Sequence, residues 1–170
     1  LANIMKDISK KPEEDRDRTA PLPPEKPNET KRKAKYGWKD NEVIQEIIKD
    51  EPIIERIIQA ESSGNAATPD SSTGARGLMQ IMKKTAEEKT GYGVNYNLSY
   101  DELFDPVKNV KYGADYFKGL KKYFGNDRDA LIAYNWGPDN AKDWLEKGGK
   151  LRKLPKETRD YVKKILGSGK

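Results

Sequence analysis

The sequence contains no cysteine and no histidine among its 170 residues. Their absence excludes disulfides, thiolate nucleophiles, Ser-His-Asp catalysis and histidine-based zinc or iron sites. Any catalysis by this chain is therefore left to carboxylate, tyrosine, lysine and hydroxyl groups. The sequence also lacks an apolar run long enough to cross a membrane, so no membrane span is predicted.

The amino terminus lacks the apolar core of a signal peptide in its first residues, LANIMKDISKK. The chain begins with Leu1 rather than Met, which favours a processed product or a piece cut from something longer. The missing signal peptide favours a part of a virion or of a secretion machine.

Large apolar residues are scarce in the first forty positions, which hold five of the ten prolines and 11 basic against 8 acidic residues. Such a segment cannot bury enough apolar surface to fold alone. We therefore predict a flexible, disordered, charged and proline-rich leader over residues 1–38. Residues 39–170 are long enough for one folded domain of ordinary size.

After the leader, neither sign of charge dominates: residues 41–170, called the body below, carry 22 basic and 20 acidic side chains. Residues 142–170 alone hold 10 basic against 4 acidic side chains. This local excess favours a solvated helical face; the alternative is binding to an anionic surface such as cell wall, lipid or nucleic acid.

The body reads as helical throughout, without a strand signal of any strength. Apolar spacing and capping residues predict helices that begin near residues 41, 52, 77, 106, 127, 141 and 156. The segment 66–74, AATPDSSTG, is predicted to be a loop, and 92–100 an irregular loop or short hairpin. The fold class is therefore mainly α and compact.

An acidic residue continues the apolar stripe of the segment IIERIIQAESSGN at 53–65. Glu61 lies four residues after Ile57 and three after Ile58, so its carboxylate should point toward the interior. An unpaired carboxylate there either finds a partner or takes a raised pKa. A carboxylic acid that stays protonated near neutrality is suited to be a general acid.

Four short motifs interrupt the helical pattern: ESSGN at 61–65, STGARGLMQ at 72–80, AYNWGP at 133–138 and ETRDYV at 157–162. Each alone has an ordinary structural explanation, such as a turn or a core aromatic. Together, in this order, they resemble the lysozyme-like lytic transglycosylases, the family of the soluble lytic transglycosylase catalytic domain. The resemblance spans about residues 41–166 and implies a goose-type lysozyme-like fold.

The resemblance implies cleavage of the β-1,4 bond between N-acetylmuramic acid and N-acetylglucosamine in peptidoglycan, with a 1,6-anhydro product and no cofactor or metal. It implies that Glu61 is the general acid and then the general base. It also implies that substrate contacts come from residues of all four motifs and of the loop before the second: Ser62, Ser71, Met79, Gln80, Tyr134, Asn135 and Tyr161. In that set Met79 is expected to line the cleft, and the two tyrosines to lie around Glu61.

The sequence departs from the family pattern at two places. The loop between Asn65 and Gly74 is one residue longer than the commonest form, which leaves the substrate-binding serine open between Ser71 and Ser72. Lys83 follows Met82 where proline is usual. Neither departure touches Glu61.

Three other functions compete with that of a transglycosylase. A muramidase-type hydrolase needs a second carboxylate, and Asp70 is the one plausible acid in the loop and helix after Glu61, since Glu87 and Glu88 fall on a polar face. A non-catalytic peptidoglycan-binding module would be marked by loss of the acid, and Glu61 is present. A nucleic-acid binder lacks an aromatic platform, so no nucleic-acid partner is expected.

The expected partner is the peptidoglycan glycan strand, met in the periplasm or cell wall. A bacterial wall-remodelling enzyme, a component of a conjugation pore and a virion protein would all share this domain. A leader of this composition suits a tether to a larger assembly, which favours carriage in a phage virion or a secretion or conjugation apparatus.

Overall fold

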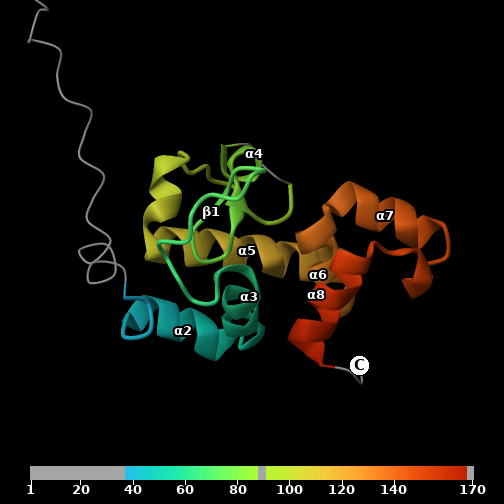
Figure 1. Ribbon diagram of the computed structural model, residues 1–170, viewed down its shortest axis with the longest axis horizontal. Helices are drawn as coiled ribbons and strands as arrows, with labels where there is room; N and C mark the ends of the chain where they lie inside the picture. Colours follow the sequence, from blue (N-terminus) through green and yellow to red (C-terminus); the bar gives the residue numbers. More distant parts are fainter. Residues whose placement is uncertain (1–36, 88–90, 168–170) are drawn as a thin grey trace, which may run out of the picture.

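The computed structural model describes residues 37–87 and 91–167, and in these ranges it contains seven α-helices and one two-stranded sheet (Figure 1). The mainly α class predicted from the sequence is confirmed. In chain order the elements are α2 (Glu42–Asp50), α3 (Ile53–Ser62), β1 (Ala75–Arg76), β2 (Ile81–Met82), α4 (Lys83–Glu87), the 3₁₀ helix η1 (Asp101–Phe104), α5 (Pro106–Phe124), α6 (Asp127–Trp136), α7 (Pro138–Glu146), the 3₁₀ helix η2 (Leu151–Lys153) and α8 (Lys156–Leu166).

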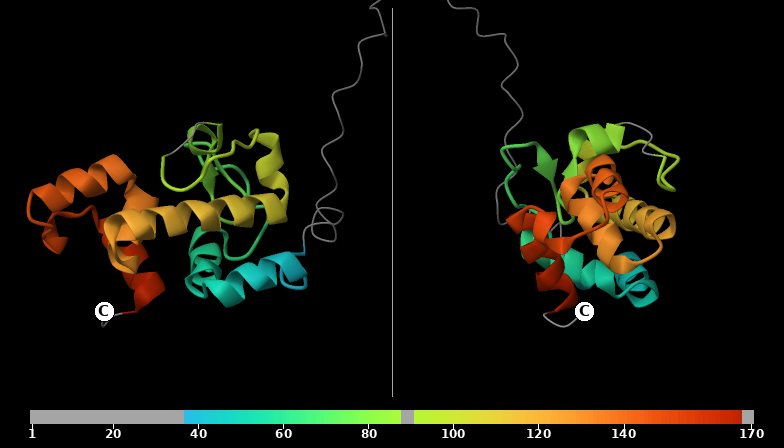
Figure 2. Two further views of the ribbon diagram at one scale, coloured as in Figure 1. Left: turned by 180° about the vertical axis from the view of Figure 1, so that it is seen from behind. Right: turned by 90° about the vertical axis from the view of Figure 1, so that its right-hand side faces the viewer.

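Helix α5 runs through the middle of the molecule, with α2 and α3 on one side and the sheet and α4 on the other (Figures 1 and 2). It packs against α2 and α6, while α6 packs against α7 and α8, and α8 returns to α3. Helix α5 has 19 residues. Neither it nor any other helix within 37–87 and 91–167 combines the length and the apolar character that a bilayer crossing requires.

The apolar stripe of α3 is buried as its spacing predicts. Ile54, Ile57 and Ile58 have no exposed surface, and Ile53 retains 7%. Burying such a side chain stabilises the fold by about 1.5–3 kcal/mol, so this short helix is held mainly by tertiary packing. The stripe fixes the rotation of α3 about its axis, which in turn sets the direction of the residues in its last turn.

Helix boundaries follow the capping residues of the sequence. The side chains of Asn41, Asp105 and Asn126 accept hydrogen bonds from main-chain N–H groups in the first turns of α2, α5 and α6. Pro106 opens α5, and Gly125 closes it with φ +84°, a conformation that glycine adopts without steric cost. The turn predicted around NWGPDN is shorter than expected: the single residue Gly137 separates α6 from α7.

The helix predicted from residue 77 is wrong in its first turn and a half. Residues 75–82 instead form a hairpin in which Ala75 pairs with Met82 and Arg76 with Ile81, antiparallel. Gly77 (φ +79°) and Gln80 (φ +46°) take the left-handed conformation, which no helix tolerates. Leu78 and Ile81 are both buried, and their three-residue separation imitates a helical stripe. The helix begins at Lys83, and its predicted end falls partly on residues 88–90, outside the described residues.

Trp38 belongs to the core, although the sequence places it in the leader. Its side chain is 4% exposed, and its Nε1 donates to the carbonyl of Gly64 at 2.7 Å. The packed domain therefore begins at least one residue before the predicted boundary at 39. The rest of the predicted leader, up to residue 36, lies outside the described residues.

Candidate active site

Glu61 lies in the last turn of α3 and is partly buried. The hydroxyl of Tyr161, on α8, donates to its Oε1 at 2.7 Å, although the two residues are 100 positions apart in the chain. The interior direction predicted from the isoleucine stripe therefore brings the carboxyl group to the contact between α3 and α8. The stripe thus predicts the inward direction of the acid, and α8 supplies its neutral donor.

Burial raises the pKa of Glu61 from 4.5 to about 7, because a charged carboxylate loses its hydration there. The hydrogen bond from Tyr161 and the positive charge of Lys164 both oppose this rise, and the negative charge of Glu157 adds to it. A group with a pKa near 7 exchanges its proton at neutral pH in both directions. Glu61 is thus suited to act first as an acid and then as a base.

Two tyrosines from separate helices surround this carboxyl group. Burial raises the pKa of Tyr161 and of Tyr134 well above 10, and the charge of Glu61 adds to both shifts. Both phenols are therefore neutral donors at any physiological pH. Tyr134, on α6, donates to the carbonyl of Met79 at 2.8 Å, so it holds the hairpin segment rather than contacting Glu61 by a hydrogen bond.

The contact between α3 and α8 is fixed by two cations that donate across it. Arg56, on α3, donates from Nη1 to the carbonyl of Ile165 at 3.3 Å, and Lys164, on α8, donates to the carbonyl of Ala60 at 3.3 Å. Each links a side chain of one helix to the main chain of the other. These bonds keep Tyr161 facing Glu61.

Two side chains predicted to contact the substrate instead contact other parts of the protein. The hydroxyl of Ser62 is 2.9 Å from the carbonyl of Leu78 and 3.1 Å from that of Ile58, and it ties the end of α3 to the hairpin. Met79 has no exposed surface; its side chain packs on Gly113, where an added Cβ would lie 2.5 Å from the sulfur. The expectation that Met79 lines an open cleft is therefore wrong, because the hairpin turns this side chain into the core.

The remaining predicted contacts retain exposed surface. Gln80 is partly exposed at the end of the hairpin turn, where its Nε2 donates to the carbonyl of Gly77 at 3.0 Å. Ser72 is exposed, and Asn135 is partly exposed. Ser71 is partly exposed and uses its oxygen within the loop, where it accepts from the N–H of Ala75 at 2.8 Å. The choice between the two serines stays open.

Asp70, the predicted second acid of a hydrolase, forms an ion pair. Both of its carboxylate oxygens accept from Arg76, Oδ1 from Nε at 2.8 Å and Oδ2 from Nη2 at 2.5 Å. A carboxylate held in this bidentate fashion has both oxygens engaged. Within the described residues, no three acidic side chains lie close enough together to hold a metal ion.

Glu157 is a residue of the site that the sequence analysis did not single out. It is exposed on α8, and its charge acts on the pKa of Glu61. The signal was present in the motif ETRDYV, because Glu157 precedes Tyr161 by four residues and therefore lies on the same helical face. Only the packing of α8 on α3 reveals that this face turns toward Glu61.

Comparison with known proteins gives one family match. The transglycosylase SLT domain model matches residues 41–155. A transglycosylase of Enterobacteria phage PRD1 is 30% identical over 119 residues, which cover 70% of this chain and 40% of that protein. A putative soluble lytic murein transglycosylase of Haemophilus influenzae is 33% identical over 122 residues, 65% of this chain and 20% of that protein. The chain thus spans less than half the length of these relatives.

Solved structures with the same fold carry related names. The 70 kDa soluble lytic transglycosylase of Escherichia coli superposes with a TM-score of 0.59 at 33% identity, covering 67% of this chain and 20% of that one. An inactive mutant of the lytic transglycosylase Slt of Pseudomonas aeruginosa gives a TM-score of 0.59 at 29% identity, covering 73% and 22%.

Proposed function

The chain belongs to the transglycosylase SLT domain family, and we propose that it is a peptidoglycan lytic transglycosylase. Its substrate is the β-1,4 bond between N-acetylmuramic acid and N-acetylglucosamine, and its product ends in 1,6-anhydro-N-acetylmuramic acid. The observation that carries the proposal is Glu61, a partly buried carboxyl group with a pKa raised to about 7 and a neutral tyrosine hydroxyl on its Oε1. The names of the matched relatives agree with this activity.

In the first step, protonated Glu61 gives its proton to the glycosidic oxygen as the bond to C1 of the muramic acid breaks. Positive charge develops at C1, as in an oxocarbenium ion. The ionised carboxylate then takes the proton from the C6 hydroxyl of the same sugar while that oxygen bonds to C1. The proton balance of Glu61 is zero over the cycle, and no water is consumed.

The neutral tyrosines support both steps. Tyr161 donates to Glu61 and stabilises the carboxylate that the first step creates, because a hydrogen bond to the charged form favours it. Tyr134 holds the carbonyl of Met79 and thereby the hairpin beside the acid. The exposed parts of Gln80, Asn135 and the loop hydroxyls of Ser71 or Ser72 are the groups we assign to the N-acetyl and hydroxyl groups of the glycan.

A hydrolase is the alternative, and it requires an acid that activates water or attacks C1. Asp70 has both oxygens on Arg76, which argues against that role. Glu157 is coupled to Glu61 through its charge, and it lies on an exposed helix face. With both oxygens of Asp70 engaged by Arg76, the C6 hydroxyl of the bound sugar is favoured as the attacking group by its proximity.

We expect the released glycan ends to carry the anhydro sugar. Mass analysis of fragments from purified peptidoglycan should find the ends about 18 Da lighter than hydrolytic ends, by one water, and should find no reducing end. Asp70→Asn and Glu157→Gln should keep this product. Reducing ends as the main product, lost in either variant, would replace the lyase with a muramidase that uses the corresponding acid.

The pH dependence should follow the proton of Glu61. Because the first step needs the protonated form, kcat/KM should be level below pH 7 and fall tenfold per pH unit well above it. Tyr161→Phe removes a hydrogen bond that lowers this pKa, so the fall should move to higher pH. The exposed Tyr123→Phe should leave the profile in place; an unmoved profile in Tyr161→Phe would remove Tyr161 from this role.

The site of action that fits this activity is the periplasm or cell wall. The match to a phage transglycosylase supports carriage in a virion, and the proline-rich residues before Trp38 suit a tether to a larger virion or secretion assembly. An assembly partner would be found by cross-linking the full chain in its native particle.

A further inference from the structure

Arg76 is a buried cation with polar and aromatic contacts outside the Glu61 site. It lies in strand β1 and is 8% exposed. Its guanidinium carbon lies over the ring of Tyr100, 3.5 Å from the centroid, and over that of Phe104 at 3.9 Å. A planar cation stacked on aromatic faces in a buried position holds one orientation.

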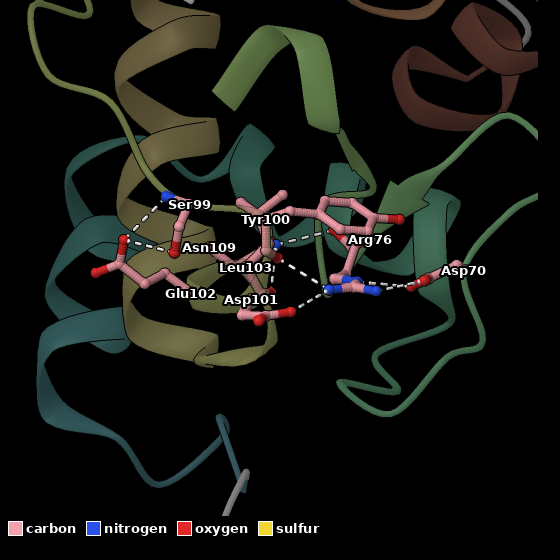
Figure 3. Close-up of polar contacts among 8 residues, drawn as sticks. All are labelled: Asp70, Arg76, Ser99, Tyr100, Asp101, Glu102, Leu103 and Asn109. Atoms are coloured by element: carbon pink, nitrogen blue, oxygen red, sulfur yellow. Dashed lines mark hydrogen bonds and ion pairs between the residues drawn. The ribbon is translucent and has the colours of Figure 1, made fainter. Parts of the chain in front are cut away.

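The hydrogen bonds of this guanidinium join two segments that are distant in the sequence. On one side Arg76 binds Asp70 of the 66–74 loop through two bonds (Figure 3). On the other side its Nη1 donates to the carbonyl of Tyr100 at 3.0 Å and to Oδ1 of Asp101 at 3.2 Å. The loop is therefore attached to η1 and the residue before it through one side chain.

The 66–74 loop begins beside the catalytic acid and carries the serines assigned to the glycan. At its start, the hydroxyl of Thr68 donates to the carbonyl of Asn65 at 2.7 Å and lies 3.4 Å from that of Ser62, the residue after Glu61. At its end, Ser71 donates its N–H to the carbonyl of Ala75 at 3.0 Å and closes a turn. Asp70 immediately precedes this turn.

Little apolar burial holds the tip of this loop. Pro69, Asp70, Ser72 and Thr73 are exposed, and Ala66 is the buried apolar residue near its base. Bidentate arginine–carboxylate pairs add geometric specificity as well as energy, because both partners are planar. The pair with Arg76 therefore supplies the orientation that packing does not.

We propose that Arg76 is a positioning residue for glycan binding, which acts through Asp70 to hold the 66–74 loop with Ser71 and Ser72 facing the substrate. The inference rests on the proposed function, because it assigns these hydroxyls to the glycan. Arg76 directs its donors to Asp70, Asp101 and the carbonyl of Tyr100 rather than to Glu61, so it acts on the binding of the sugar rather than on proton transfer. A loop ordered only a tenth of the time binds its ligand about tenfold more weakly.

The first test measures binding and turnover of Arg76→Lys and Asp70→Asn with soluble, uncrosslinked glycan strands. Each substitution keeps the size of the side chain but breaks the bidentate pair. We expect KM to rise about tenfold and kcat to change less than about twofold. A fall in kcat at constant KM, or an unchanged KM in both variants, would overturn the proposal.

The second test asks whether the two residues act as one unit. The double variant should show the same rise in KM as the larger single variant, because the second substitution removes nothing further. Independent, multiplying effects would overturn the pairwise role. Asp70→Asn alone carries the test if Arg76→Lys does not fold, because the Asp70 side chain is 34% exposed and its replacement leaves no buried gap.

A readout without chemistry separates this proposal from the proposed reaction. In the Glu61→Gln background, hydrogen exchange at the amides of Ser71 and Ala75 should quicken in both variants, and the Kd for a chito-oligosaccharide should rise. Unchanged exchange would overturn the proposal even if KM rises. Reducing-end products from the unaltered protein would overturn the lyase but leave this result intact.

Two substitutions serve as controls. Asp101→Asn removes the other carboxylate that pairs with Arg76. The side chain of Asp101 is 95% exposed, so this substitution should leave KM within about twofold of the parent. Asn41→Ala removes the cap of α2, so it lowers stability away from the loop and should leave KM unchanged. A rise in KM for Asn41→Ala would show that general destabilisation, not loop order, sets the affinity.

Discussion

Glu61→Gln should abolish peptidoglycan cleavage while the protein remains folded. Glutamine has nearly the shape of glutamic acid and keeps an oxygen that accepts from Tyr161, but it cannot donate and then accept a proton. General acid–base catalysis by one group contributes roughly 10²–10⁴-fold, and here one carboxyl group serves both steps. We expect the loss of kcat to be at least at the upper end of that range, measured as release of soluble fragments.

The same substitution should raise stability, which controls for misfolding. The pKa of Glu61 is 4.5 ordinarily and about 7 when folded, so between these pH values the native state binds more protons than the unfolded state. Stability therefore falls as pH rises through this window, by up to roughly 3 kcal/mol in full. Glutamine does not titrate, so the Glu61→Gln variant does not lose this stability. Its free energy of unfolding should therefore exceed that of the parent above pH 7, and the difference should vanish below about pH 4.5.

If the Glu61→Gln variant retains more than about one hundredth of the parent activity, Glu61 is not the general acid. Glu157 would be the next residue to test, because its charge acts on Glu61. Glu46→Gln, an exposed change on α2, is the matched control and should retain full activity and stability. A Glu61 variant that melts below the parent at pH 8 would contradict the raised pKa.

Local signals in the sequence predict the helices well. The isoleucine stripe of α3, Pro106 at the start of α5 and Gly125 at its end are read from spacing and caps alone, because those features act within one or two turns. The direction of Glu61 follows from the same stripe. The inward position of the carboxyl group is therefore predictable from the stripe alone, without its partner Tyr161.

The hairpin at 75–82 shows where local pattern fails. Buried residues three apart fit a helix, yet Gly77 takes φ +79°, and an added Cβ at this position would lie 2.1 Å from Nδ2 of Asn109. That constraint comes from α5, more than thirty residues later. A two-residue strand pair also has too few positions for the alternation that identifies strands.

The roles of single site residues depend on contacts that no motif records. Met79 and Ser62 belong to the family motifs, but the first packs on Gly113 and the second bonds the carbonyl of Leu78. Asp70 reads as a solvated turn residue until Arg76 is seen beside it. Motifs thus locate the site, while the division of its residues between substrate and scaffold requires the packed structure.

Asn109→Ala should strongly destabilise the protein, although no motif in the sequence includes this residue. Asn109 lies on α5 with no exposed surface. Its Nδ2 donates to the carbonyls of Arg76 at 2.9 Å and Leu103 at 3.0 Å, and its Oδ1 accepts from the N–H of Met79 at 2.8 Å. One amide thereby satisfies three main-chain groups of the hairpin and η1, which form no regular ladder there.

Alanine at position 109 leaves those three groups buried without a partner. Each unsatisfied group costs about 1–3 kcal/mol, so we expect a loss of roughly 3–5 kcal/mol in the free energy of unfolding. For a domain of this size that lowers Tm by about 10 °C, measured by calorimetry. Asn140→Ala, which removes an exposed bond from Nδ2 to the carbonyl of Trp136, is the matched control and should cost less than about 0.5 kcal/mol. Equal losses in the two variants would mean that water reaches the hairpin, and that Asn109 does not hold the segment on which Arg76 and Gln80 depend.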